Sequence, residues 1–571
     1  MIEGIPVSNG IAIGNAVVIK EIEIKIDRVT IVNTKEEVDR LRAALKKAEI
    51  QLQCLKTKAE KKFGIGKAEI FDAHLLILND PEFIDSVIQK INKEKVTSEY
   101  AVNETIKAFV ASFEGMEDEY ISGRATDIGD VGKRILCVLV GKENTVISEI
   151  DSECIIIARD LTPSDTAQIN KEVILGFVTE IGGKTSHTAI MARSLEIPAV
   201  VGVNNITETA KNGDIVIVNG SSGEVILNPN EETLKKYKKK KSFENQNKEK
   251  LLKYINAKTI TLDGIEVEVS ANIGSPEDIE NVLKYGADGV GLFRSEFLYM
   301  NSSSLPTEEE QFESYSQVAK KIKNKPVIIR TLDVGGDKNL PYLDIGTEMN
   351  PFLGYRAIRV CLVRQDIFKS QLRAILRASA FGNLRIMFPM ISGLEELLSA
   401  KLILEEVKTD LLEKHISFNK NIEIGIMIEI PSAAIMSDVL AKEVDFFSIG
   451  TNDLIQYTIA VDRLNDKIAN LYDPYNPAVL RLIKLVIANG HKEGIKVCMC
   501  GEAAADLKLI PVLLGFGLDE FSMSPSSILR SRQIISSINY SEAKELSEKV
   551  LSFTKIEEIK VFLESSSKII I

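Results

Sequence analysis

The second half of the chain alternates short apolar runs with amphipathic stretches, and this alternation constrains the fold more than any other feature. The runs have the length and the β-branched and aromatic content of strands, and patterns typical of helices, such as PEDIENVLKYG, separate them. Eight strand–helix units predict a closed parallel (β/α)8 barrel with a long connection after the third strand. The runs are VEVSANI (267–273), GVGLF (289–293), PVIIR (326–330), RIMFPM (385–390), IEIGIMIE (422–429), VDFFSIG (444–450), IKVCMC (495–500) and DEFSM (519–523).

The first half of the chain predicts an α/β domain interrupted by helices. Strand-like texture at 4–20 returns at 145–228, and between them apolar residues recur at spacings of three and four. The predicted domains are an α/β domain at 1–29 and 143–228, a helical subdomain at 30–142, a linker helix at 229–258 and the barrel at 259–571.

Composition narrows the class of protein. The 571 residues exceed one hydrophobic core, and 70 basic against 82 acidic residues give a net charge of −12, which argues against a main role in binding nucleic acid or an anionic membrane. Six of the seven positions 235–241 are lysine, and a solvated helix face is favoured there over a nucleic-acid patch. The scattered cysteines and the absence of a signal peptide or a long apolar run predict a cytoplasmic protein without membrane insertion.

Most residues at the ends of the predicted barrel strands are polar, and strand ends are where barrel enzymes carry their chemistry. Any one of these arginines alone would be read as a surface salt bridge, but together the residues favour a site. They are Asn272, Arg294, Arg330, Met390, Glu429, Asn452, Asp453 and Cys500.

The residue types indicate an anionic substrate. Arg294 and Arg330, with Arg356 and Arg463 nearby in sequence, offer forks that match phosphate and carboxylate oxygens. Glu429 and Asp453 are hard oxygen ligands too few to enclose an ion, which suits Mg²⁺ because it keeps waters and takes substrate oxygens. We therefore expect a small phosphorylated acid bound with Mg²⁺. The Gly pair beside Asp337 and Lys338 in LDVGGDK is weak evidence, since a plain turn explains it.

Cys500 permits two interpretations from its position. It is either a small buried hydrophobe or, near several arginines, an acid with a lowered pKa. A metal pair with Cys498 is not favoured, because no further soft ligands accompany the two thiols.

His187 lies in GGKTSHTAIMARSLEIPAVVG, and its neighbours make it the histidine that is the best candidate for a catalytic role. Thr185 or Ser186 can cap a helix that ends at Pro198, so His187 falls in its first turn, where backbone N–H groups stabilise an anion. A capping or packing role is the alternative, and the glycines that allow close approach favour a nucleophile. The other histidines have simpler interpretations: His74 as part of a partner-binding face, and His415 and His491 near helix C-termini.

Ten sequence blocks together resemble one family. They are GIPVSNGIAIG, LTPSDTAQIN, GGKTSHTAIMARSLEIPAVVG, GLFRSEFLYM, RTLDVGGDK, NPFLGYRAIR, MIEIPSAA, IGTNDLIQYTIAVDR, MCGE and GLDEFSMS. In this order over essentially the whole chain, they resemble the enzyme I family of the bacterial sugar phosphotransferase system, the phosphoenolpyruvate–protein phosphotransferases. The resemblance implies phosphoryl transfer from phosphoenolpyruvate to the enzyme and then to the histidine-containing phosphocarrier protein, as the first step of sugar uptake and phosphorylation.

The resemblance also implies roles for single residues. His187 matches the phosphorylated histidine, Thr166 a threonine that hydrogen-bonds it, and Cys500 the proton donor that completes pyruvate. The helical subdomain matches the docking site of the phosphocarrier, and the barrel matches the homodimer interface. Arg294, Arg330, Arg356, Asn452 and Arg463 match substrate ligands, and Glu429 and Asp453 match Mg²⁺ ligands.

Departures and rival functions are few. Cys498 stands where the family has glycine, and AAAD (503–506) replaces MAGD, which bears on the surroundings of Cys500.

Phosphoenolpyruvate synthases and pyruvate phosphate dikinases share both domains but need a nucleotide-binding domain for which the filled length leaves no room. A nitrogen-regulatory paralogue carries an additional sensory domain. A silent binding module is disfavoured by the intact set of matched residues.

Overall fold

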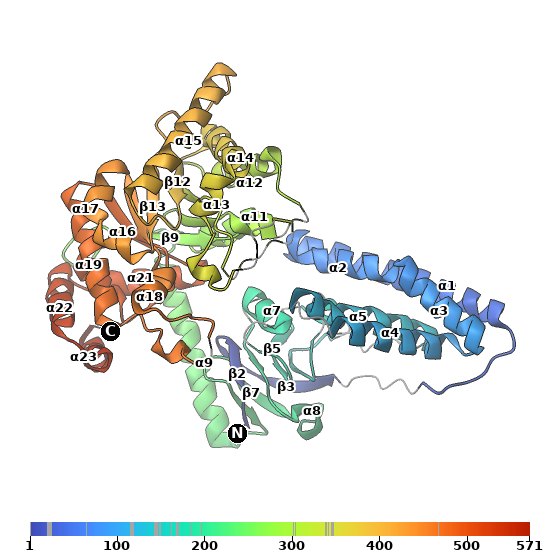
Figure 1. The fold of residues 1–571 in the computed structure, drawn as a ribbon. Helices are drawn as coiled ribbons and strands as arrows, with labels where there is room; N and C mark the ends of the chain where they lie inside the picture. Colours follow the sequence, from blue (N-terminus) through green and yellow to red (C-terminus); the bar gives the residue numbers. More distant parts are fainter. Residues whose placement is uncertain are drawn as a thin grey trace. The chain divides into compact units, whose positions relative to one another are not determined.

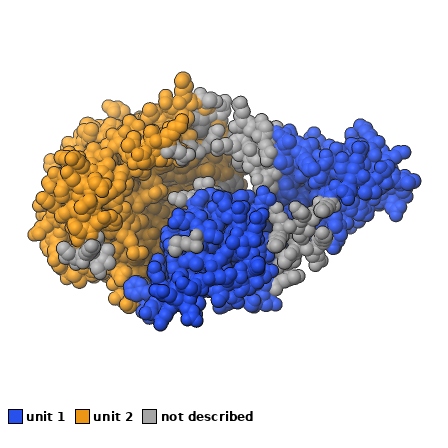
Figure 2. Space-filling model, turned by 90° about the horizontal axis from the view of Figure 1, so that it is seen from below, with its two compact units in different colours: residues 1–247 blue, residues 248–571 orange. Residues whose placement is uncertain are grey.

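The chain folds into two compact units, Met1–Asn247 and Lys248–Ile571, and each has its own hydrophobic core (Figure 2). The division falls inside the segment 229–258, where α9 (Glu231–Leu252) runs. The domain bounds expected from the sequence remain predictions. The computed structural model describes residues 2–570 except 20–25, 64, 115–118, 142–146, 148–149, 162, 167–168, 171, 184–185, 196, 301, 303, 337, 339, 341, 344–345, 347 and 466.

An eight-stranded mixed sheet forms the centre of the first unit, and its strands come from both sides of a helical segment (Figure 1). β3 pairs in parallel with β4 across that segment, so the predicted α/β domain with a helical insertion is confirmed. The order is β1-β8-β7-β3-β4-β5-β6-β2. The strands are β1 Ile2–Glu3, β2 Ile5–Ser8, β3 Ile11–Ile19, β4 Cys154–Ala158, β5 Ile174–Thr179, β6 Ala199–Val201, β7 Ile215–Asn219 and β8 Glu224–Leu227.

Both faces of this sheet are covered, which explains the continuous apolar run of β4. All five residues of β4 are buried. Ala189 and Ala192 of α7 (His187–Leu195) pack into the core on one face, and Ile206 of α8 (Ile206–Thr209) packs into the core on the other. A strand buried on two faces loses the polar–apolar alternation of a half-exposed strand.

In the described part of the segment between β3 and β4, helices α1 to α5 pack around a separate core (Figure 1). In α3, Asp80 accepts hydrogen bonds from two backbone N–H groups at the N-terminus, and Phe83, Val87 and Ile91 form the buried face at a spacing of four. No described helix is long and apolar enough to cross a membrane. The helices are α1 Thr34–Phe63, α2 Ile65–Leu78, α3 Pro81–Glu94, α4 Ser98–Glu114 and α5 Glu119–Val140.

His74 corrects one expectation from the sequence. Its side chain is 1% exposed inside this helical core, and Nε2 lies 3.2 Å from Asp127 Oδ1. A buried ring with a polar partner does not form part of an exposed partner-binding face. His74 is therefore a structural residue of the helical segment.

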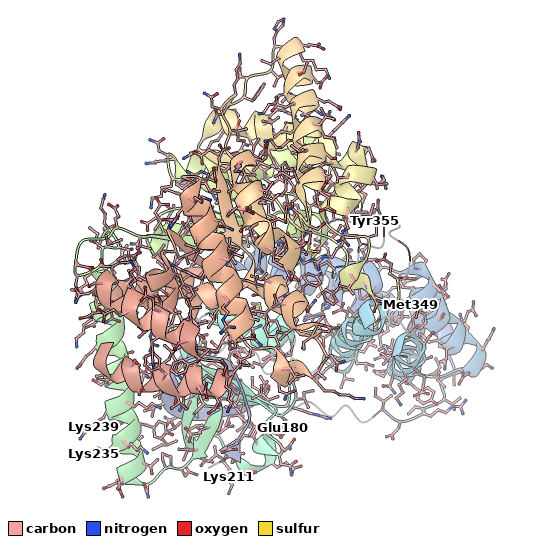
Figure 3. All side chains as sticks on the ribbon, turned by 60° about the vertical axis from the view of Figure 1, so that its left-hand side comes forward. Glu180, Lys211, Lys235, Lys239, Met349 and Tyr355 are labelled. Atoms are coloured by element: carbon pink, nitrogen blue, oxygen red, sulfur yellow. The ribbon has the colours of Figure 1, made fainter. Side chains whose placement is uncertain are left out.

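The lysine run lies on α9, where Lys235 and Lys239 project from the helix (Figure 3). Both side chains are exposed, as expected for a solvated face. Tyr237 interrupts the run and is buried with Ile217 and Ile226, and its hydroxyl donates to Glu224 Oε2 at 2.9 Å. The aromatic exception thus anchors α9 on the sheet of its own unit.

The second unit is a closed barrel of eight parallel strands, so the predicted (β/α)8 fold is confirmed. Each strand falls within one residue of a run identified in the sequence, and α18 (Thr451–Ile459) follows β14 at the rim. The strands are β9 Glu268–Ile273, β10 Val290–Arg294, β11 Val327–Arg330, β12 Leu384–Phe388, β13 Ile424–Ile428, β14 Phe446–Ile449, β15 Lys496–Met499 and β16 Glu520–Met523.

The barrel strands are surrounded by helices, whose apolar faces complete the core of this unit (Figure 1). They are α10 Ile279–Lys284, α11 Glu296–Met300, α12 Glu308–Ile322, α13 Ile358–Val363, α14 Gln365–Ala378, α15 Leu394–Glu413, α16 Pro431–Ile435, α17 Ser437–Leu440, α18, α19 Pro477–Lys492, α20 Ile510–Phe516, α21 Ile528–Ile535, α22 Tyr540–Ser552 and α23 Ile556–Ile570.

One ion pair on the outside of the barrel predicts a pH-dependent stability. His491 Nε2 in α19 lies 2.9 Å from Asp519 Oδ2, and this hydrogen bond raises the pKa of the histidine. The pair therefore stabilises the fold fully below the unfolded pKa of about 6.5, and this contribution is lost as the pH rises through the higher folded pKa. We expect His491→Gln to lower the free energy of unfolding by less than about 1 kcal/mol at pH 6 and by nothing at pH 9. Urea titrations at both pH values test this, and equal losses would contradict it.

Candidate active site

The residues expected at the strand ends gather at one rim of the barrel. Arg294 and Arg330 are the last residues of β10 and β11, and Glu429 and Cys500 follow directly after β13 and β15. Asp453 lies in the first turn of α18. Because the strands are parallel, their C-terminal ends meet at the same rim.

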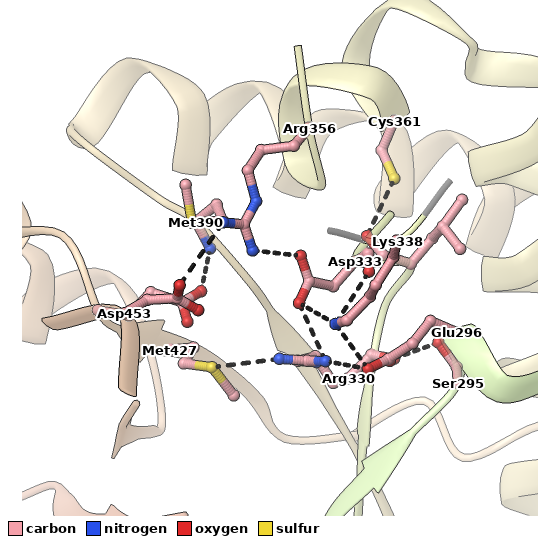
Figure 4. Close-up of polar contacts among 12 residues, drawn as sticks. Ser295, Glu296, Arg330, Asp333, Lys338, Arg356, Cys361, Met390, Met427 and Asp453 are labelled. Carbon is pink, nitrogen blue, oxygen red and sulfur yellow. Dashed lines mark hydrogen bonds and ion pairs between the residues drawn. The ribbon is translucent and has the colours of Figure 1, made fainter. Parts of the chain in front are cut away.

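Arg330 is the centre of a buried ionic cluster at this rim (Figure 4). Its side chain is 7% exposed, and Nη2 lies 2.5 Å from Glu296 Oε1 and 3.0 Å from Asp333 Oδ2. Lys338 Nζ contacts the same two carboxylates, at 2.9 Å and 3.0 Å. Two cations therefore share two buried carboxylates.

Asp333 also reaches a third cation. Its Oδ1 lies 3.1 Å from Arg356 Nη2. Burial alone raises the pKa of a carboxyl group, but Arg330, Lys338 and Arg356 hold the pKa of Asp333 well below its usual range. Asp333 is therefore ionised at neutral pH and orients all three cations.

Arg356 enters the cluster from the long connection after β11. Its Nη1 donates to the Tyr457 hydroxyl at 2.9 Å, and that hydroxyl donates to the carbonyl of Phe352. The next residue, Ala357, has a φ of 52°, which is strained for a residue with a Cβ. Such backbone strain persists only where the surrounding structure stabilises it. Here it occurs at the residue that directly follows Arg356.

Glu429 and Asp453 fit the expected divalent cation. Glu429 is buried, and burial together with the nearby charges of Asp453 and Asp333 raises its pKa to about 8. Asp453 Oδ1 is buried without a hydrogen bond, 3.6 Å from Arg356 Nη1. A cation would relieve both conditions. No group of three His, Cys, Asp or Glu side chains able to hold a metal occurs among the described residues, so the remaining ligands would be water and substrate.

Asn452 and Arg463 lie at the edge of the buried cluster. Asn452 Oδ1 accepts a hydrogen bond from the backbone N–H of Glu502 at 3.1 Å, which ties α18 to the segment after β15. The backbone N–H of Arg463 donates to Gln456 Oε1 at 3.1 Å, and its side chain hydrogen-bonds Tyr472. Both side chains are partly buried at the rim.

Cys500 is 3% exposed, as for a buried hydrophobe, and it packs with apolar residues of the barrel interior. Burial raises its pKa to about 11, and Arg330 and Arg294 offset this only in part. The lowered pKa considered from the sequence is therefore wrong. The group is a protonated thiol at neutral pH. Cys498 lies one layer below and donates to Glu520 Oε2 at 3.3 Å.

His187 belongs to the first unit, where it is the first residue of α7. Its side chain lies outside the described part of the structure, as does Thr185. Ser186 Oγ accepts from the N–H of Ala189 at 3.3 Å, so Ser186 caps this helix as expected. Thr166, at the end of α6 (Pro163–Thr166), is buried.

Reading the sequence missed three residues of the barrel cluster: Glu296, Asp333 and Tyr457. Glu296 follows Arg294 by two residues in FRSEF, and Asp333 follows Arg330 by three in RTLD. A carboxylate this close to a strand-end arginine was the available signal, because a buried guanidinium requires a partner. Tyr457 had no such signal. Asp337 lies outside the described residues, whereas Lys338 belongs to the cluster.

Known proteins match this chain in each of its parts. Residues 248–540 match the PEP-binding domain of PEP-utilising enzymes, residues 3–124 match their N-terminal domain, and residues 150–223 match their mobile domain. The chain is 52% identical to the phosphoenolpyruvate-protein phosphotransferase of Priestia megaterium over 99% of both chains. It is 51% identical to those of Staphylococcus carnosus (99% of both chains) and Bacillus subtilis (99% of this chain and 100% of the relative).

These identities extend over nearly the whole length of each relative, so the likeness covers the barrel, the helical segment and the mobile domain together. The chain therefore belongs to the phosphoenolpyruvate–protein phosphotransferase family, the enzyme I family of the phosphotransferase system, and catalyses phosphoryl transfer from phosphoenolpyruvate by way of its mobile domain.

Proposed function

We propose that the cationic cluster at the barrel rim binds the phosphate and carboxylate of phosphoenolpyruvate. The observation that carries this proposal is that three cations, the buried Arg330 and Arg356 and the partly buried Lys338, share two carboxylates, Glu296 and Asp333. Among these five groups the positive charges exceed the negative charges by one, in a poorly solvated site where an anion is bound strongly. The proposed substrate ligands are Arg294, Arg330, Arg356, Asn452 and Arg463.

Glu429 and Asp453 are the proposed Mg²⁺ ligands. When bound there, the ion supplies further neutralisation of the phosphate charge. The protein's part is to hold the two carboxylates. The backbone N–H of Met390 donates to Glu429 Oε1 at 2.7 Å, which orients that side chain and leaves Oε2 for another partner.

His187 is the proposed nucleophile. It is the first residue of α7, and the N-terminus of a helix favours an anion such as a phosphoryl group. Thr188 Oγ1 donates to the carbonyl of Leu161 at 3.1 Å and so anchors this end of the helix. Thr166 is the proposed hydrogen-bonding partner of the ring. In-line attack of the neutral imidazole on phosphorus breaks the bond to the enol oxygen and leaves the enolate of pyruvate.

Cys500 is the proposed proton donor. A pKa of about 11 keeps the thiol protonated at neutral pH, as an acid requires before the reaction. Its S–H bond breaks as a C–H bond forms at C3 of the enolate. The product is pyruvate, and the thiolate recovers a proton from solvent before the next turnover.

The phosphoryl group then passes from His187 to the histidine-containing phosphocarrier protein, for which the proposed docking site is the helical subdomain. Leu76 of α2 and Ile50 of α1 are 73% and 59% exposed, and apolar side chains so exposed favour a partner surface.

A homodimer through the barrel is also proposed, because apolar side chains are exposed on the helices around it. Leu402 of α15 and Val363 of α13 are 64% and 70% exposed. We expect Leu402→Glu to shift the protein towards monomer at micromolar concentration, as measured by light scattering after size exclusion. An unchanged mass for both Leu402→Glu and Val363→Glu would place the interface elsewhere.

Labelling with radioactive phosphoenolpyruvate tests the proposed chemistry. The full-length protein with Mg²⁺ should take up one acid-labile, base-stable phosphoryl group, as for phosphohistidine, and pass it to purified phosphocarrier. Excess chelator should suppress labelling. A folded protein that takes no label, or a label that survives acid, would contradict the proposal.

A further inference from the structure

Asn272 joins the first strand of the barrel to the residue proposed as proton donor. Its amide nitrogen, Nδ2, donates to the carbonyl of Cys500 at 3.0 Å and lies 3.4 Å from the carbonyl of Ser522. Asn272 lies in β9 and Cys500 directly after β15, 228 positions apart in the sequence. A contact this remote in sequence is made only by closing the barrel.

The surroundings leave one orientation of this amide. Both backbone carbonyls accept hydrogen bonds and cannot donate, so the NH2 group must face them. The amide oxygen, Oδ1, then accepts from Ser522 Oγ at 2.6 Å, and Ser522 is fully buried. An aspartate at position 272 would set a carboxylate oxygen against two carbonyl oxygens. The position therefore requires asparagine, and not merely a polar side chain of this size.

Cys500 needs such support because the strand that carries it ends at Met499. On one side its backbone N–H donates to the carbonyl of Ile449 at 3.1 Å. The next residue, Gly501, packs so closely on α18 that a Cβ there would lie 1.9 Å from Thr451 Oγ1. The Asn272 amide holds the carbonyl of Cys500 from β9, on the remaining side.

The thiol itself makes a weak polar contact: Cys500 Sγ donates to the carbonyl of Ile449 at 3.9 Å. The surrounding apolar burial is non-directional, so it retains the thiol in the barrel without aiming its S–H bond. The hydrogen bonds of the Cys500 backbone fix where this weak contact forms and so supply most of the aim. The apolar neighbours in this cluster are Leu292, Ile328, Met387, Met427 and Phe446.

We propose that Asn272 is a positioning residue, which holds the backbone of Cys500 so that the thiol delivers its proton to one face of the enolate. This inference rests on the proposed role of Cys500. The C3 atom of the enolate has two faces, and a donor fixed on one side protonates only that side. A displacement of about 1 Å is enough to slow such a step by about a hundredfold. Enolate that escapes into solvent is protonated on both faces.

Stereochemistry tests this aim directly. The full-length protein turns over (Z)-[3-²H]phosphoenolpyruvate with Mg²⁺ and phosphocarrier in tritiated water, and lactate dehydrogenase traps the pyruvate for analysis of its chiral methyl group. Wild type should give one configuration, and Cys500→Ala should give a racemic methyl group. For Asn272→Asp we expect the excess of one configuration to fall by at least about half and pyruvate formation to slow about tenfold. Single-turnover labelling of His187 should change less than about threefold.

Two further variants control for folding and for the loss of any amide. Asn489 Nδ2 in α19 donates to Ser437 Oγ at 2.8 Å on the outside of the barrel, so Asn489→Ala should keep full stereospecificity. Ser522→Ala removes the hydroxyl that holds Asn272 Oδ1 and should lower the excess less than Asn272→Asp does. It also provides the test if Asn272→Asp does not fold.

Each other outcome has a definite meaning. Full stereospecificity in folded Asn272→Asp, or in Ser522→Ala where Asn272→Asp does not fold, would overturn the positioning role. So would a parallel loss of His187 labelling with a raised KM, because Asn272 would then be a substrate ligand. Full stereospecificity in Cys500→Ala would instead overturn the proposed proton donor, whatever the Asn272 variants do.

Discussion

His187→Ala should take up no acid-labile phosphoryl group from phosphoenolpyruvate. We expect a loss of at least about 10⁴-fold in labelling rate, the scale seen when the nucleophile of a covalent mechanism is removed. The physical reason is that the proposed phosphate site is left without an attacking atom. Single-turnover labelling with radioactive phosphoenolpyruvate and acid quench measures this directly, and pyruvate release should stop with it.

A matched control separates the nucleophile from the general loss of a histidine. His491 lies on the outside of the barrel in an ion pair with Asp519, so His491→Gln should label at the wild-type rate. His187→Ala should also keep the wild-type melting temperature within about 2 °C, because alanine is well tolerated in a helix. Undiminished acid-labile labelling of His187→Ala would place the phosphoryl group on another residue.

Asp333→Asn should destabilise the barrel unit by about 3–5 kcal/mol, the range for breaking a buried ion pair from one side. Asp333 contacts Arg330, Lys338 and Arg356, and the amide leaves Arg330 and Lys338 with Glu296 and leaves Arg356 with the more distant Asp453. The loss of their common anchor should also reduce kcat/KM about a hundredfold, through misplaced phosphate ligands. Urea unfolding and steady-state turnover measure the two effects.

The pH dependence of the same variant has a defined sign. Since the folded pKa of Asp333 is held well below the unfolded value of about 3.9, the stabilisation is fully present above that value and is lost as the pH falls through the folded pKa. The difference between wild type and Asp333→Asn should therefore be largest at neutral pH and should shrink under strongly acidic conditions.

Asp366 supplies the control for a carboxylate lost from an ion pair. Its Oδ2 lies 2.7 Å from Arg364 Nη2, but the Asp366 side chain is 61% exposed. Asp366→Asn should therefore cost at most about 1 kcal/mol. Equal effects of Asp333→Asn and Asp366→Asn would show that burial does not strengthen the cluster.

The sequence by itself determined the order and type of the elements. All eight barrel strands lie at the apolar runs from which they were predicted, because alternation of short apolar runs with helical periodicity is a local signal. The barrel then brings strand ends to one rim, so that Arg294, Arg330, Glu429 and Cys500 could be named as neighbours before any distance was known. The order of motifs along the chain was likewise sufficient to indicate the family.

Only the tertiary structure decided which groups pair and what the pairing does to them. The sequence pattern did not identify Glu296 and Asp333, although their carboxylate oxygens lie 2.5 Å and 3.0 Å from Arg330 Nη2. Burial raises the pKa of Cys500 because it outweighs the nearby arginines, whereas one interpretation of the sequence was a lowered pKa. The Asn272–Cys500 contact spans 228 positions. Burial, charge pairing and closure of the barrel depend on distances between remote segments, and no local pattern in the sequence contains those distances.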